Sequence, residues 1–177
     1  MRRSAARFCG AAAMLATVAW TSPSAAGEEA TINAFAAWVG QGATFKTGAT
    51  DLTFVGSLVG SLYIETDKGP VLSGEIVCPA TVKIAEDASQ RGTGSCTVTA
   101  RDGGQVFADL TCTGIFLIGC EGDFKLTGGT QRFSGITGGG PVLIRSDHRS
   151  ITVVANVGSN DRGTGILYLR GLRYTIP

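Results

Sequence analysis

The chain has 177 residues, 26 of them glycine, and its 15 lysines and arginines nearly balance its 14 acidic residues, for a formal net charge of +1. Three of the basic residues lie within the first seven positions, so the remainder is slightly acidic and has no basic stripe. Because phosphate recognition needs clustered lysine and arginine, nucleic acid is excluded as an expected partner.

The first 26 residues have the pattern of a secretory signal peptide. Three arginines open the chain, an alanine-rich apolar stretch follows over residues 8–20, and small residues at 24–26 precede the expected cleavage position. The alternative is a membrane anchor, but a bilayer-spanning helix needs about 20 apolar residues. We therefore expect an exported chain, periplasmic or secreted, that has no membrane span after signal removal and forms one domain.

Residues 27–50 are expected to form an N-terminal arm that precedes the main domain. Ile32, Phe35, Ala36 and Val39 have helical spacing, but the segment is short, so a short helix and an irregular arm both remain open. Its aromatic residues would cover one end of the following domain or gate a ligand cavity there.

The main domain, residues 51–177, is predicted to consist of strands. The first two strands, 52–65 and 71–84, alternate apolar inner positions with polar ones. Pro79 is expected at a sheet edge, a bulge or a gap in the hydrogen-bonded ladder because it has no amide donor. Their inner faces are expected to carry Leu52, Phe54, Leu58, Leu62 and Ile64 in one strand and Leu72, Ile76, Cys78, Ala80 and Val82 in the other.

Six further strands are predicted beyond a polar loop at 85–94. Turn signals at 102–104, 147–149 and 160–163 separate them, and the expected strands are 95–101, 105–113, 121–127, 141–146, 150–158 and 164–176. Eight strands with short turns predict an all-β antiparallel barrel or sandwich. The long strands bent at glycines favour a single eight-stranded barrel.

Four cysteines lie beyond the signal segment, and an even number in an exported protein indicates two disulfides. Cys112 and Cys120 are expected to lie opposite each other across a strand pair and to form a structural bridge, which leaves Cys78 to pair with Cys96. The other pairings remain open, and a zinc site is disfavoured because no paired C-x-x-C spacing occurs. The apolar loop between Cys112 and Cys120 should fold over a barrel end or meet a partner.

The segment 126–138, Leu-Thr-Gly-Gly-Thr-Gln-Arg-Phe-Ser-Gly-Ile-Thr-Gly, resembles the Gly-Thr-Gly-x-Phe-x-x-x-x-Gly element of the allene oxide cyclase barrel and dirigent superfamily. The chain looks like the small exported bacterial members of that group, whose function is unassigned. It departs from the pattern at Gln131, where the element has a glycine, and this should loosen the turn.

The resemblance implies a calycin-like, eight-stranded antiparallel barrel with an apolar interior. Plant members of the group cyclise a fatty-acid epoxide or steer radical coupling, and they are often trimeric, so a homo-oligomer is left open for this chain. Their catalytic residues cannot be carried over, because no local motif here matches them.

No catalytic, metal-binding or cofactor-binding set is predicted from the residues. His148 is the only histidine, and its neighbour Asp147 shares its expected turn, which is the wrong arrangement for a catalytic triad. A solvated turn histidine is expected, with a proton shuttle or weak metal contact at the barrel mouth as the alternative. The glycines at 128–129 and 138–140 lie between strands, whereas a phosphate loop leads into a helix.

The favoured hypothesis is a non-catalytic exported barrel that binds a small hydrophobic molecule. The residues expected to line its interior or mouth are Phe54, Leu58, Leu62, Phe124 and Tyr168. One alternative is a cyclase or isomerase that templates a reactive hydrophobic intermediate, and another is a structural, envelope-associated protein with a packed barrel. The volume and lining of the barrel interior distinguish the binding and templating hypotheses from the packed barrel.

Overall fold

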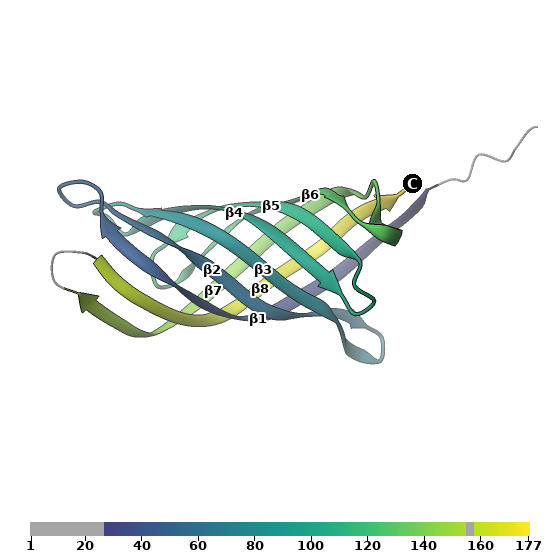
Figure 1. The fold of residues 1–177 in the computed structure, drawn as a ribbon, viewed down its shortest axis with the longest axis horizontal. Coiled ribbons are helices and arrows are strands. Elements are labelled where there is room, and N and C mark those ends of the chain that lie inside the picture. Colours follow the sequence, from purple (N-terminus) through teal and green to yellow (C-terminus); the bar gives the residue numbers. More distant parts are fainter. Residues whose placement is uncertain (1–26, 155–157) are drawn as a thin grey trace, which may run out of the picture.

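The computed structural model describes residues 27–154 and 158–177, and the expected signal peptide lies outside these ranges. Eight antiparallel strands follow one another around a closed barrel, in which each strand pairs with the next in sequence and the last pairs with the first (Figure 1). The expected all-β class and eight-stranded barrel are confirmed. The strands are β1 (Glu28–Lys46), β2 (Leu52–Thr66), β3 (Gly69–Ile84), β4 (Ser89–Ala100), β5 (Gln105–Ile115), β6 (Gly119–Gly129), β7 (Thr137–Val154) and β8 (Gly158–Ile176).

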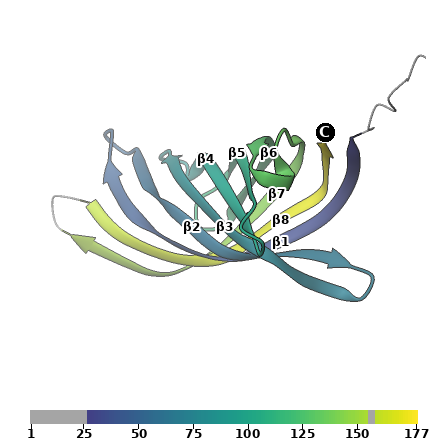
Figure 2. The same cartoon turned by 45° about the vertical axis from the view of Figure 1, so that its right-hand side comes forward.

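The up-and-down strand order divides the connections between two ends of the barrel. The β1–β2, β3–β4, β5–β6 and β7–β8 connections lie at one end, which we call the distal end. The start of β1, the C-terminus and the other three connections lie at the opposite, terminal end. Figure 2 shows the β2–β3 hairpin projecting beyond the neighbouring strands at the terminal end.

The segment expected to be an N-terminal arm is the first strand of the barrel. β1 pairs with β2 along one edge and with β8 along the other, so the barrel begins near residue 28 and not at residue 51. Its buried positions Ala34, Ala36, Trp38 and Gly40 alternate with more accessible ones, as in a strand with one face inside. The expectation of a helix or arm was wrong because alanine is a weak strand former, and pairing with two neighbouring strands overrides that local preference.

Three segments expected to be connections lie wholly or partly within strands. β4 begins at Ser89, within the expected loop 85–94, and the short inward-facing residues Gly92 and Gly94 hid its alternation. β7 continues through the expected turn at 147–149, where the chain shifts register against β8 between His148 and Ser150. The expected turn at 160–163 likewise lies inside β8. The predicted number of strands was right only because two errors cancel: β1 was missed, and β7 was predicted as two strands.

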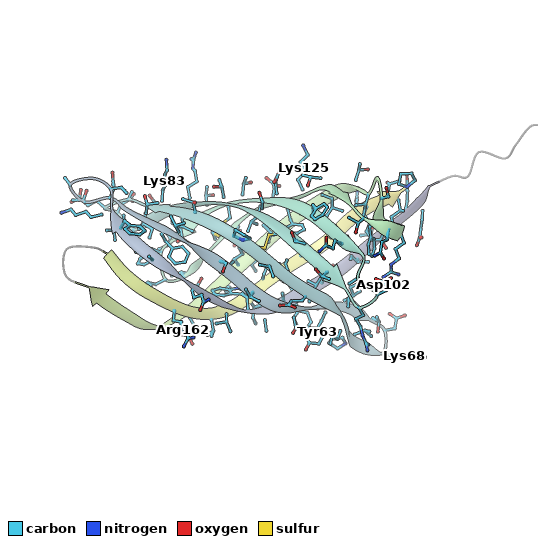
Figure 3. The ribbon with its side chains drawn as sticks, viewed as in Figure 1. Tyr63, Lys68, Lys83, Asp102, Lys125 and Arg162 are labelled. Carbon is cyan, nitrogen blue, oxygen red and sulfur yellow. A yellow bond between two sulfur atoms is a disulfide. The ribbon has the colours of Figure 1, made fainter. Side chains whose placement is uncertain are left out.

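The outer surface of the barrel carries the charged side chains, and Lys83, Lys125 and Arg162 project away from it in Figure 3. Leu72, which was expected on the inner face of its strand, lies outside. Leu72 pairs with the outward-facing Tyr63 and is 42% exposed. A register shift in the β2–β3 pair next to Tyr63, of the kind that a β-bulge produces, reverses which side of the sheet Leu72 faces.

Both expected disulfides are present inside the barrel. Cys78 and Cys96 lie on the neighbouring strands β3 and β4, with Cα atoms 4.1 Å apart. The β3–β4 ladder has a gap that contains Pro79, which is one of the three placements expected for this residue. Cys112 and Cys120 are also bonded, with Cα atoms 5.5 Å apart. They are not directly opposite as expected, because each pairs with a glycine of the other strand and the bond runs diagonally across the ladder. The connecting turn is thus shorter than the loop that the sequence indicated.

The half of the barrel towards the terminal end is filled by side chains. Phe124, Leu167 and Leu169 are fully buried there. The short 3₁₀ helix η1 (Gln131–Phe133) follows β6, and Phe133 and Ile136 pack against this core. Gln131 replaces a glycine of the Gly-Thr-Gly-x-Phe-x-x-x-x-Gly element and adopts a φ of +54°. The turn therefore forms with a non-glycine residue in the left-handed region.

Candidate functional site

An apolar cavity of about 100 Å³ lies inside the barrel towards the distal end. For comparison, an engineered apolar cavity of about 150 Å³ in another protein stays dry and binds benzene. All eight strands and the β5–β6 turn contribute to the wall. The lining residues are Trp38, Gly40, Phe54, Leu58, Ala80, Val82, Ile84, Gln90, Gly92, Thr93, Leu110, Cys112, Phe116, Leu117, Cys120, Ile144, Ser146 and Gly163.

The cavity exists because several inward positions of these strands carry small residues. Gly40, Ala80, Gly92 and Gly163 leave space where the terminal half of the barrel has large side chains. A barrel of eight strands is just wide enough either to be filled by side chains or to hold one small ligand. This barrel does both, in different halves.

The lining is nearly free of polar groups. Among the described residues that line the cavity none is charged. The polar residues among them are Gln90, Ser146 and Trp38, together with Thr93, which is at an exposed position of β4. The amide Nε2 of Gln90 donates a hydrogen bond of 2.9 Å to the carbonyl oxygen of Gly119. Such a wall favours a neutral molecule, because an ion would lose its hydration without gaining a partner.

Trp38 is the largest side chain of the wall and is 5% exposed. Its ring fits over two glycines: a Cβ at Gly165 would overlap it, and a Cβ at Gly40 would come within 3.1 Å of the Cζ3 atom. The Nε1 atom is buried and has no hydrogen-bond partner. Buried indole N–H groups usually find an acceptor, so this donor is an exception that requires an explanation.

The β5–β6 turn covers part of the cavity, in agreement with the expectation that the apolar loop folds over a barrel end. Phe116 and Leu117 line the cavity, while Ile118 is 59% exposed. The backbone N–H of Phe116 donates a hydrogen bond of 2.8 Å to the carbonyl oxygen of Ala88 in the β3–β4 connection. The Cys112–Cys120 bridge joins the two strands below the turn and thereby holds it in place.

The five residues expected to bind a ligand lie in three different environments. Phe54 and Leu58 line the cavity. Leu62 and Phe124 are buried in the packed core and do not belong to the cavity wall. Tyr168, expected in the interior or at the mouth, lies on the outer face of β8, because it pairs with the outward-facing Phe35 of β1. The alternation of inward and outward residues in β8 is interrupted near Gly171, whose backbone N–H donates a hydrogen bond to the side-chain oxygen of Asn33. The sequence did not show this irregularity.

The Tyr168 hydroxyl donates to the carboxylate of Glu65 on β2, at 3.0 Å from both oxygens. This hydrogen bond raises the pKa of Tyr168, because ionising the phenol would place two negative charges side by side. Since the folded-state pKa lies above the unfolded one, the contribution of this bond to stability is present below the unfolded pKa. It is lost as the pH rises through the folded pKa.

We therefore expect the Glu65→Gln variant to lower the pKa of Tyr168 towards that of an ordinary tyrosine. The measurement is an absorbance titration of tyrosinate, with Tyr168→Phe used to identify which transition belongs to this residue. An unchanged transition in Glu65→Gln would show that the carboxylate does not control the phenol in solution.

The described residues contain no group of three or more His, Cys, Asp or Glu side chains placed to hold a metal ion. Within the same residues, no helix has the length and apolarity to span a bilayer. The side chain of His148, for which a solvated turn position was expected, lies outside the described part of the structure.

Comparison with known proteins adds little to this geometry. No family model and no curated protein matches the chain. A solved structure of a pterocarpan synthase dirigent protein is similar to it, with 9% sequence identity and a TM-score of 0.36, over 85% of this chain and 93% of that one. A TM-score of this size does not establish a shared fold, so the barrel described above depends on this chain's own strand pairing.

Proposed function

We propose that this protein binds a small, neutral, apolar molecule inside the distal half of its barrel. The observation that carries the proposal is the cavity of about 100 Å³ with its nearly apolar wall. Ligand sites are typically concave and apolar, with a few polar groups that orient the ligand. The same cavity argues against a barrel that is packed throughout.

The proposed place of action is the periplasm or the extracellular space. Two disulfides inside the barrel support it, since such bonds persist in oxidising compartments. The signal-peptide pattern of residues 1–26 supports it independently.

The Ala80→Leu variant tests the binding site. Ala80 lines the cavity, and a leucine there would occupy much of the free volume. With benzene as the probe, followed by two-dimensional amide NMR, we expect wild-type shifts concentrated at cavity residues such as Gly40 and Gly92. The variant should bind benzene at least about tenfold more weakly, because the lost pocket removes the apolar contact area.

The matched control is Ala37→Leu, which makes the same substitution at an exposed position on the outer face of β1. It should leave benzene binding unchanged. We expect the melting temperature of Ala80→Leu to be equal to or above that of the wild type, since filling a cavity commonly stabilises. Equal benzene affinity in the wild type and Ala80→Leu would exclude the cavity as the binding site.

A further inference from the structure

Two polar side chains of the cavity wall lie at its distal end, next to the β5–β6 turn. Gln90 is the second residue of β4, and its Nε2 donates a hydrogen bond of 2.9 Å to the carbonyl oxygen of Gly119. The backbone N–H of Ser146 on β7 donates one of 3.3 Å to the carbonyl oxygen of Ile118. The two residues are therefore attached to consecutive carbonyl groups at the same turn, one from β4 and the other from β7.

The strand pairing shows that both side chains face the interior of the barrel. Gln90 is the direct partner of Ile84, which is buried and lines the cavity. Ser146 is the direct partner of Gly165, where a Cβ would overlap the buried ring of Trp38. Directly paired residues of an antiparallel ladder project from the same face of the sheet. Gln90 and Ser146 therefore point into the barrel, where both line the cavity.

One polar atom of each side chain is open to a ligand. Gln90 Oε1 and Ser146 Oγ have no hydrogen-bond partner among the described residues. Both atoms remain accessible, since in that part of the chain Trp38 Nε1 is the buried side-chain nitrogen or oxygen that lacks a partner. The indole N–H is closed off from the cavity, because its side of the ring packs over Gly165.

The hydrogen bond to Gly119 decides what Gln90 can offer a ligand. A carbonyl oxygen accepts only from the amide nitrogen of glutamine, so this bond fixes which way the amide is turned. Oε1 is left as an acceptor, which a ligand satisfies only with an O–H or N–H donor. The Ser146 hydroxyl can either donate or accept. The wall therefore requires a donor at Gln90 and tolerates either function at Ser146.

We propose, on the basis of the binding function above, that the ligand is a small neutral alcohol with an aliphatic body, whose hydroxyl group donates to Gln90 Oε1 and accepts from Ser146 Oγ. Its hydrocarbon part lies against the apolar wall, which includes Leu58, Ala80 and Leu110. Because none of the described lining residues is charged, a carboxylate or an amine would be buried without a counter-charge. Two open polar side chains are too few for the several hydroxyls of a sugar.

The test uses two ligands of nearly the same shape. Cyclopentanol carries the hydroxyl group, and methylcyclopentane has a methyl group in its place. Dissociation constants for both are measured on the full chain, on its Ser146→Ala variant and on its Gln90→Met variant. Because methylcyclopentane reports any change in the shape of the cavity, the informative quantity is how much more a substitution weakens cyclopentanol than methylcyclopentane.

We expect Ser146→Ala to weaken cyclopentanol about fivefold, the effect of losing one neutral hydrogen bond. Methylcyclopentane should bind this variant as tightly as the wild type or more tightly, because a hydroxyl that it leaves unpaired has been removed. Gln90→Met should weaken cyclopentanol about tenfold more than methylcyclopentane, since the ligand hydroxyl then loses its acceptor. Equal changes for the two ligands in either variant would overturn the assignment of that residue.

Cyclopentanone tests the direction of the hydrogen bond to Gln90. A ketone accepts but does not donate, so it can keep the contact with Ser146 and makes none with Gln90 Oε1. Relative to methylcyclopentane, its affinity should fall about fivefold in Ser146→Ala and by less than about twofold in Gln90→Met. A loss in Gln90→Met as large as that of cyclopentanol would contradict the assignment of Oε1 as the acceptor.

Failure of this inference is distinguishable from failure of the proposed function. If neither benzene nor any of the three ligands binds the wild type, the binding function itself is wrong. If the cavity binds benzene and methylcyclopentane but not cyclopentanol, the binding function stands and the alcohol assignment is overturned.

Discussion

Replacing Phe124 with alanine is expected to lower the free energy of unfolding by about 3–5 kcal/mol. Phe124 lies in β6, is 2% exposed, and is among the largest side chains that the barrel buries completely. Its removal loses apolar contact and leaves a void. A closed ring of hydrogen-bonded strands has little freedom to collapse into that void, so the cost should lie near the upper part of the range observed for such substitutions.

Chemical denaturation measures this effect, and Phe107→Ala provides the matched control. Phe107 belongs to the adjacent strand β5 but is 36% exposed, so the same truncation there should cost no more than about 1 kcal/mol. Similar losses for the two variants would mean that Phe124 does not occupy the core position assigned to it.

Removing the Cys78–Cys96 bridge should cause the second large loss. The two cysteines are 18 residues apart, and in the chain-entropy description a loop of this length is worth about 3 kcal/mol of stability. Both sulfurs are buried in the core, so Cys78→Ala with Cys96→Ala is the appropriate variant. Thermal unfolding under non-reducing conditions gives the change in stability.

The corresponding double alanine variant of Cys112 and Cys120 is the comparison. These residues are eight apart, so the loss should be smaller, about 2.5 kcal/mol. Part of this loss of stability should be confined to the β5–β6 turn. Amide hydrogen exchange at Phe116 should therefore become faster before exchange in the rest of the barrel does. A Cys78/Cys96 variant as stable as the wild type would show that the strand ladders alone hold β3 and β4 in place.

The strands that could be predicted from the sequence are those with large residues on the inner face. β2 alternates Phe54, Leu58 and Leu62 with polar neighbours, and its bounds were found within one residue of those in the structure. β1 was missed because its inner face is made largely of alanine and glycine, which carry little strand signal. Leu72 was placed on the wrong face because a one-residue register shift reverses every side chain beyond it, and sequence alternation does not reveal such a shift.

The strength of each strand's alternation also explains which cavity residues could be predicted from the sequence and which could not. Phe54 and Leu58 were recognised as inward-facing residues of a well-marked strand. Trp38, the largest side chain of the cavity wall, was assigned to an arm because β1 was not recognised. The available signal was the alternation of Ala34, Ala36, Trp38 and Gly40. The cavity volume depends on the sum of small residues from several strands, so no single segment of sequence could indicate it.

The pairing of β1 with β8 bears on how the chain acquires its structure. Glu28 is the partner of Ile176, so closing the barrel joins residues from opposite ends of the chain, whereas the other ladders join neighbours in sequence. Contacts between residues so distant in sequence slow folding, because the intervening chain must first lose its freedom. Until β8 is in place, β1 presents an unpaired edge that could recruit another chain. A chain delivered N-terminus first is therefore most prone to aggregate just before its last 19-residue strand arrives.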